Sequence, residues 1–173
     1  RFKGEGKTDP LPLGKVDIEV PGTAWPNARG FACFAGDTAS RACKSADFSA
    51  PPYRNDSGRN DIVRLIAACS EHSLYVAAEC RAAITPPQEG DLSWMNVFIG
   101  TENGPWNGLG FVVNRLGPGS ICRLNAAGET QQVGSARFVI ENNVIKMELP
   151  RDLLGIGGGA EVRLKIADHV QDL

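Results

Sequence analysis

Short segments in which every second residue is hydrophobic recur along this chain, and no segment carries a sustained hydrophobic stripe at helical spacing. A period of two is typical of a β-strand, because successive side chains point to opposite faces of the sheet. Polar or Gly-rich turns separate the segments. Many short strands with turn chemistry between them predict an all-β protein, an antiparallel two-sheet β-sandwich of the jelly-roll type.

The expected strands fall in one continuous domain. Residues 1–14 are rich in Gly, Pro and Lys and predict an irregular arm, so the sandwich domain is expected over 15–173. Residues 21–60 predict a long ordered loop, and residues 151–154 a short helical turn after Pro150 ends the preceding strand. Asn142 and Asn143 suit the positive φ angles of a tight hairpin. The expected strands are Lys15–Val20, Asp61–Cys69, Leu74–Arg81, two within Trp94–Arg115, Ile121–Asn125, Ala136–Glu141, Val144–Leu149 and 162–166.

Composition excludes several classes of partner. The chain has 173 residues, which fits one domain that needs neither metal nor disulfide to fold. Its 18 Lys and Arg against 20 Asp and Glu give a net charge of −2, without the basic surface of a nucleic-acid binder. No stretch approaches the roughly 20 apolar residues of a membrane span. The chain opens at Arg1 without a signal peptide, so we expect it to have been cut from a longer precursor.

The cysteines do not predict a metal site, because none of them forms a C-x-x-C pair or lies near a His cluster. Antiparallel pairing around the turn at 70–73 places Cys69 near Leu74 and Cys80 near Val63, too far apart for a disulfide. These two are expected to pack as small apolar groups. A bridge between Cys33 and Cys43 stays open, and the redox compartment with it. The five cysteines are Cys33, Cys43, Cys69, Cys80 and Cys122.

Trp106 lies in a polar, Gly-rich turn between the two strands expected in Trp94–Arg115. Its indole either caps the core or stands exposed as a stacking platform. A sugar site needs aromatic faces together with amides, carboxylates or Arg that bond hydroxyl groups. The alternatives are that Trp94 is a lid of the core, that Asn114 and Arg115 form a buried polar anchor, and that Trp25 pins the long loop. The candidate ligand-binding residues are Trp106, Asn107, Asn114, Arg115, Trp94, Glu102 and Trp25.

A structural calcium ion is one interpretation of the polar turn that precedes the strand at 61–69. Asp56, Asn60 and Asp61 carry the oxygen ligands that calcium prefers. The alternative is that Asn60 and Asp61 bond the local backbone while Arg59 pairs with a carboxylate, as such turns commonly do.

Catalytic motifs are missing from the sequence. His72 and His169 lie near no nucleophile motif, and neither G-x-S-x-G nor H-E-x-x-H occurs. Glu141 and Glu148 lie across the expected hairpin and could face one another, but such an exposed carboxylate pair is usually solvated, and glycosidase chemistry also needs a cleft. We therefore expect a module that is not an enzyme.

Several ordered motifs resemble a known family of non-catalytic domains. The chain resembles the β-sandwich domains similar to family 9 carbohydrate-binding modules of secreted bacterial glycan-degrading proteins, over roughly residues 30–170. The motifs are Gly36-Asp37-Thr38 with Arg41, Tyr53-Arg54-Asn55, Gly58-Arg59-Asn60-Asp61-Ile62, Ile84-Thr85-Pro86, Trp94-Met95-Asn96-Val97-Phe98-Ile99, Trp106-Asn107-Gly108, Val112-Val113-Asn114-Arg115, Leu149-Pro150-Arg151 with Leu153-Leu154-Gly155, and Leu164-Lys165-Ile166-Ala167-Asp168.

The resemblance implies a module that binds carbohydrate without cleaving it and tethers a larger secreted, cell-surface or periplasmic protein to glycan, with a glycoside hydrolase as one candidate parent. The sequence departs from the relatives at Gly100-Thr101-Glu102-Asn103, where they have an Asp-rich turn, and at Ile166, where they have Trp. One alternative is a structural accessory domain that packs against a catalytic neighbour. Another is a haem-binding sandwich, for which Met95, Met147, His72 and His169 are the candidate ligands, although the strand positions of the two methionines favour the core.

Overall fold

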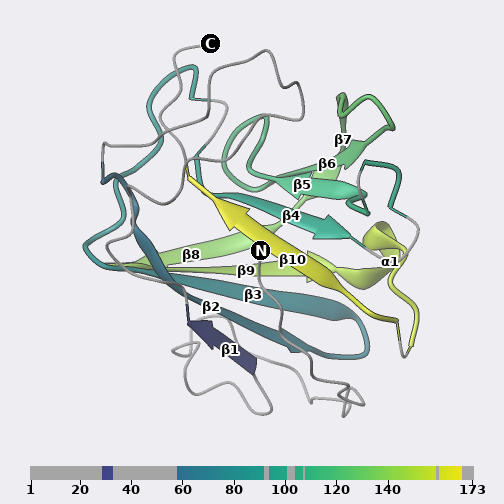
Figure 1. Cartoon of the computed structure of the whole chain (residues 1–173), viewed down its shortest axis with the longest axis horizontal. Coiled ribbons are helices and arrows are strands. Elements are labelled where there is room, and N and C mark those ends of the chain that lie inside the picture. The colour runs from purple at the N-terminus through teal and green to yellow at the C-terminus, as the bar shows by residue number, and fades with distance from the viewer. Residues whose placement is uncertain are drawn as a thin grey trace.

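The computed structural model describes residues 58–91, 94–100, 104–106, 108–158 and 160–168, together with the backbone of 29–32. These residues form ten strands and one short helix, and the strands make two antiparallel sheets that face one another (Figure 1). The predicted all-β two-sheet sandwich is confirmed.

Each sheet has five strands. The first sheet has the order β1 (Arg29–Ala32), β2 (Ile62–Cys69), β3 (Ser73–Cys80), β9 (Val144–Pro150) and β8 (Arg137–Glu141). The second sheet has the order β10 (Arg163–Ala167), β4 (Asn96–Gly100), β5 (Phe111–Val113), β6 (Ser120–Leu124) and β7 (Thr130–Ser135).

One hydrophobic core fills the space between the sheets, because alternate residues of the central strands point inward. Met95 and Met147 lie in this core with no exposed surface, which confirms the sequence prediction for both. On the inner face of the second sheet, four residues that pair across neighbouring strands point into the core: Ile166, Val97, Val113 and Ile121.

Most predicted strands are confirmed, and two strands were missed. Strand β1 lies within the predicted loop 21–60; its four residues show no alternation and they pair with β2 at the sheet edge. Strand β7 is polar and mostly exposed, so it lacks the hydrophobic period that sequence reasoning requires. The strand expected at 15–20 lies outside the described residues.

The turns follow the predicted chemistry. Asn142 adopts a φ of 52° in the β8–β9 hairpin, as predicted, whereas Asn143 does not have a positive φ. Strand β9 ends at Pro150, and helix α1 (Arg151–Leu154) follows it. Gly155 then ends the helix in the left-handed conformation, with a φ of 65°.

The described cysteines are free thiols. Cys69 pairs in register with Leu74 as predicted, whereas Cys80 lies opposite Ile62 rather than Val63 because a bulge at that end shifts the register by one residue. Cys80 is buried in the core. Cys33 and Cys43 lie outside the described residues, so a bridge between them stays a prediction.

We expect the thiols of Cys69 and Cys122 to react slowly in the folded protein. Burial raises the pKa of both thiols, and for Cys69 it outweighs the opposing charge of Arg151. Because only the thiolate reacts, alkylation at roughly pH 8 should be at least about tenfold slower in the native protein than in concentrated urea. Mass spectrometry of the two peptides over time measures the rates. Native labelling at the urea rate would contradict the burial of these side chains.

Candidate functional site

Two of the candidate binding residues lie in the core. Trp94 is 1% exposed, and its indole nitrogen donates to the Thr85 carbonyl at 2.8 Å. Asn114 is also 1% exposed; its side-chain nitrogen donates to the Met95 carbonyl at 2.9 Å, and its oxygen accepts from the Gly119 N–H at 2.8 Å. Trp94 therefore has the position of a core lid, and Asn114 that of a buried polar anchor, which were the alternatives to sugar binding.

Of the other five candidate binding residues, the structure describes Arg115 and Trp106, and neither is fully buried. Arg115 is half-buried beside Asn114 at the end of β5. Asn107, Glu102 and Trp25 lie outside the residues that the structure describes. Trp106 is therefore the candidate whose side chain is both described and partly exposed on an aromatic face.

Trp106 is held in a tight turn that follows β4. The backbone N–H of Trp106 donates to the Leu109 carbonyl at 3.0 Å, and the backbone N–H of Leu109 donates to the Trp106 carbonyl at 2.9 Å. The indole packs on a cluster of Val112, Cys122 and Leu124, and its ring centre lies 5.9 Å from that of Phe98. The turn thus places the indole on the surface of the second sheet instead of in the core.

Gly128 gives the indole its place beside the β6–β7 turn. A Cβ atom at Gly128 would lie 2.9 Å from the Trp106 indole nitrogen, and the φ of Gly128 is +81°. Any side chain there would clash with the ring and strain the backbone. The glycine therefore allows the two turns to approach each other.

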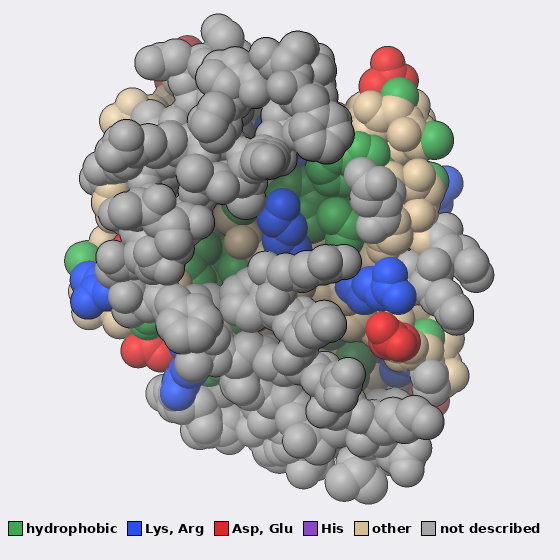
Figure 2. Space-filling view, viewed as in Figure 1, with side chains coloured by type: hydrophobic (Ala, Val, Ile, Leu, Met, Phe, Trp, Pro, Cys, Tyr) green, Lys and Arg blue, Asp and Glu red, His purple; other side chains and the backbone are tan. Residues whose placement is uncertain are grey.

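The side chains around Trp106 lie on the outer face of the second sheet. Since Val97 and Val113 point into the core, their neighbours Phe98 and Val112 point outward. Figure 2 shows hydrophobic side chains that reach the surface over β4 and β5, next to Lys or Arg side chains. We call this surface the Trp106 face and define it by Phe98, Trp106, Leu109 and Leu124 with the polar residues Asn125, Glu129, Thr130 and Lys165.

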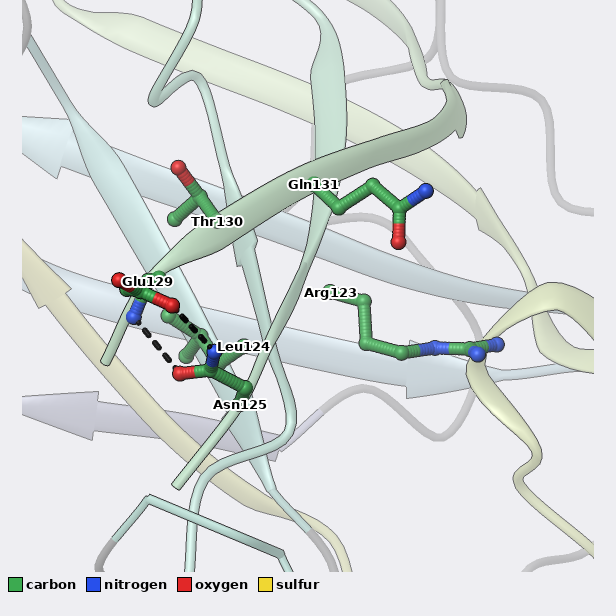
Figure 3. A pocket seen from close by; sticks show the side chains of 6 residues that line it. All are labelled: Arg123, Leu124, Asn125, Glu129, Thr130 and Gln131. Carbon is green, nitrogen blue, oxygen red and sulfur yellow. Dashed lines mark hydrogen bonds between the residues drawn. The ribbon is translucent and has the colours of Figure 1, made fainter. Parts of the chain in front are cut away.

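A hollow of about 210 Å³ lies at the β6–β7 hairpin, beside the Trp106 face (Figure 3). The Asn125 amide donates to Glu129 at 2.7 Å, and its oxygen accepts from two backbone N–H groups of the turn. Arg123, Leu124, Thr130 and Gln131 also line the hollow, and the side chains of Arg123 and Gln131 point away from those of Asn125 and Glu129 (Figure 3). The hollow is smaller than the 300–1,000 Å³ of ordinary ligand pockets.

A largely buried ion cluster joins the ends of three segments near β4. Arg59 donates to Asp168 at 2.7 and 3.1 Å and to Asp91 at 2.5 Å, and Asp168 also accepts from the Met95 N–H at 2.8 Å. Burial alone would lower the pKa of the Arg59 guanidinium, but its bonds to Asp168 and Asp91 outweigh burial and raise it. Arg59 therefore pairs with carboxylates, as one sequence interpretation expected.

The predicted calcium ligands have protein partners where they are described. The Asn60 side chain accepts from the Thr85 N–H at 2.8 Å, and Asp61 accepts from Arg81 at 2.9 Å. Asp56 lies outside the described residues. Among the residues placed by the structure, no three His, Cys, Asp or Glu side chains gather closely enough to hold a metal. Calcium binding stays a prediction that rests on the sequence.

The two hairpin carboxylates do not face one another, which corrects the pairing suggested by the sequence. Glu148 lies opposite Arg137 and accepts from it at 2.9 Å, whereas Glu141 pairs with Lys146 at 2.9 Å. The register places Glu141 opposite Val144, because the hairpin turn contains only two residues. His72 is exposed in the β2–β3 turn, and His169 lies outside the described residues.

Comparisons with protein-family models, with curated proteins and with solved structures gave no match. The resemblance to family 9 carbohydrate-binding modules therefore stays a prediction, and any function has to be argued from the residues themselves. No helix among the described residues is long and apolar enough to cross a membrane.

Among the residues that define the Trp106 face, sequence reasoning named only Trp106 as a candidate. Asn125, Glu129 and Thr130 were not candidates, because the strand that brings them to Trp106 has no hydrophobic period. Phe98 and Lys165 carried a usable signal: both occupy the strand positions that alternate with core residues, so both had to point outward.

Proposed function

We propose that this domain binds carbohydrate without cleaving it, on the Trp106 face of the second sheet. The observation that carries the proposal is a partly exposed indole on an outer sheet face, with hydrogen-bonding side chains at its border. In this proposal the domain tethers a larger secreted, cell-surface or periplasmic protein to glycan.

The aromatic part of the face suits a sugar ring. Carbohydrate rings present C–H surfaces that pack on aromatic side chains, and their hydroxyl groups need polar partners at the edge. Trp106 and Phe98 form a tilted pair at 36°, fixed from below by the buried Val112 and Cys122. A support that is already in place spares the ligand the entropic penalty of ordering the platform.

The polar part of the face can fix hydroxyl groups. Asn125, Glu129 and Thr130 line the hollow beside the indole, and Glu129 is held by the Asn125 amide. A carboxylate oxygen accepts from sugar hydroxyls, and the Thr130 hydroxyl can donate or accept. Asn125 and Glu129 replace Asn114, which is committed to the core, as hydroxyl-binding groups in this proposal.

The competing function is a structural accessory domain. It gains support from the burial of Trp94 and Asn114, which removes two of the sugar-binding candidates. The two functions differ over Trp106: a packing surface for a protein neighbour binds no free glycan, whereas a sugar platform does.

Replacing Trp106 by Ala is expected to weaken glycan binding at least about tenfold and leave the domain folded, because a central aromatic anchor carries much of a binding free energy. A glycan array screened with the parent and the variant, followed by calorimetry on the best ligand, measures the loss. Circular dichroism checks the fold.

Phe138→Ala is the matched control for Trp106→Ala. Phe138 is a half-buried aromatic residue on β8 of the first sheet, away from the Trp106 face. Its truncation should lower stability and leave glycan affinity unchanged. Equal loss of affinity in both variants, or no binding of any glycan by the parent, would reject the proposed site and favour the accessory role.

A further inference from the structure

Two cationic side chains border the Trp106 face on strand β10. Lys165 lies opposite Phe98 in the β10–β4 register, and its ammonium nitrogen is 5.6 Å from the centre of the Phe98 ring. Arg163, two residues away, points to the same outer face, and a Cβ atom on Gly108 would lie 3.0 Å from its guanidinium. Figure 2 shows Lys or Arg side chains beside the hydrophobic surface over β4 and β5.

Lys165 forms no ion pair with any residue in the described part of the chain, and its side chain is exposed. The face of the Phe98 ring attracts the ammonium on one side. The N–H donors on the other sides of the ammonium stay available for hydrogen bonds. The Lys165 ammonium, held by the Phe98 ring and without a carboxylate partner among the described residues, can therefore bind an anionic group of a ligand.

The described acidic groups near the face, Glu161 and Glu129, do not pair with Lys165. Glu161 pairs with Arg163 at 3.5 Å, and with side-chain exposures of 76% and 51% this pair is weak and easily exchanged. Glu129 is bonded to Asn125 on the far side of Trp106. Neither carboxylate is paired with Lys165.

Lys165 and Trp106 lie on opposite sides of Phe98. Lys165 belongs to β10 and Phe98 to β4, whereas Trp106 packs on side chains of β5 and β6. The Trp106 ring centre lies 5.9 Å and the Lys165 nitrogen 5.6 Å from the centre of the Phe98 ring, so the two are at most about 11.5 Å apart. A ligand that reaches both Trp106 and Lys165 is therefore an oligosaccharide rather than a single ring.

We propose that the Trp106 face selects acidic glycans, with a sugar stacked at Trp106 and a carboxylate of the same chain bound by Lys165 and Arg163. This inference rests on the proposed carbohydrate binding and adds the class of sugar to it. The aromatic pair supplies affinity for the ring, and the two cations supply the preference for a uronic acid.

The test compares acidic polymers with their own neutral forms. Polygalacturonate, glucuronoxylan and carboxymethyl cellulose are each paired with the carboxyl-reduced polymer, and calorimetry measures binding to the whole 173-residue chain. We expect at least one acidic polymer to bind roughly three- to tenfold more tightly than its reduced form, with the preference lost near 0.5 M salt.

Lys165→Gln should abolish this preference. Arg81→Gln makes the same change of charge at an exposed residue beyond the end of β3 in the first sheet, and should keep the preference. Equal binding of acidic and reduced polymers, or a preference that survives in Lys165→Gln, would overturn the acidic specificity while carbohydrate binding stands. Absence of binding to every glycan, neutral ones included, would reject the proposed function and this inference together.

Discussion

Replacing Asn114 by Ala is expected to lower the free energy of unfolding by about 3–4 kcal/mol. The substitution leaves the Met95 carbonyl and the Gly119 N–H buried without a side-chain partner, and each such loss costs about 1–3 kcal/mol. Asn114 also has a φ of 67°, which Ala adopts at a penalty of about 1 kcal/mol. Urea denaturation of parent and variant measures the difference.

Two control variants separate these contributions. Asn114→Gly removes the same two hydrogen bonds without the backbone strain, so it should destabilise by about 1 kcal/mol less than Asn114→Ala. Asn142→Ala keeps only the strain, because Asn142 is an exposed hairpin residue with a φ of 52°. A loss in Asn114→Ala no larger than that in Asn142→Ala would show that the buried hydrogen bonds do not anchor the turn at 114–119.

Removing the Asp168 carboxylate should have a comparably large effect, about 3 kcal/mol in Asp168→Ala. Asp168 is 1% exposed at its side chain and holds both the 12%-exposed Arg59 and the Met95 N–H. Loss of one partner leaves a largely buried guanidinium that relies on Asp91, and an N–H without its acceptor.

The matched control is Glu161→Ala, which removes a carboxylate from an exposed pair with Arg163. Surface pairs contribute about 0–1 kcal/mol, so this variant should stay within that range. Thermal or urea unfolding at low and high salt measures the loss of stability in Asp168→Ala and in Glu161→Ala. If Asp168→Ala were as mild as Glu161→Ala, the ion cluster would not hold β4 to the end of β10.

The fold was predictable where burial imposes a pattern. Strands β2, β3 and β9 alternate or run apolar because they fill the core, and the Asn142–Asn143 turn has the residues its φ angle requires. Strands β1 and β7 lie at sheet edges, where ladder hydrogen bonds to β2 and β6 form them. An edge strand needs no hydrophobic period, so its sequence carries little signal.

The site was predictable only at Trp106. Residue type made Trp94, Trp106 and Asn114 candidates, but residue type does not tell on which side of a strand or turn a residue lies. Asn114 is in the left-handed conformation at the end of β5, which turns its amide into the core. Thr130 reaches the face through a pairing of β6 with β7 that the sequence did not reveal.

Trp106 belongs to a second hydrophobic cluster, which lies on the outer face of the second sheet. The inward residues of the second sheet are committed to the core, and the outward cluster of Val112, Cys122 and Leu124 needs a cover of its own. Trp106, Leu109 and Phe98 provide part of that cover and remain partly exposed. The same side chains therefore stabilise the outer face and leave an aromatic surface partly exposed.

The most direct test of carbohydrate binding at the Trp106 face is an NMR titration of the three tryptophan indole N–H signals with a glycan oligosaccharide. The Trp94 indole is bonded to Thr85 inside the protein, so its signal serves as an internal reference. We predict that the Trp106 signal moves with saturation, together with backbone signals of 125–130 and Lys165, while the Trp94 signal stays in place. Shifts confined to other surfaces, or no shift with any glycan, would contradict the account.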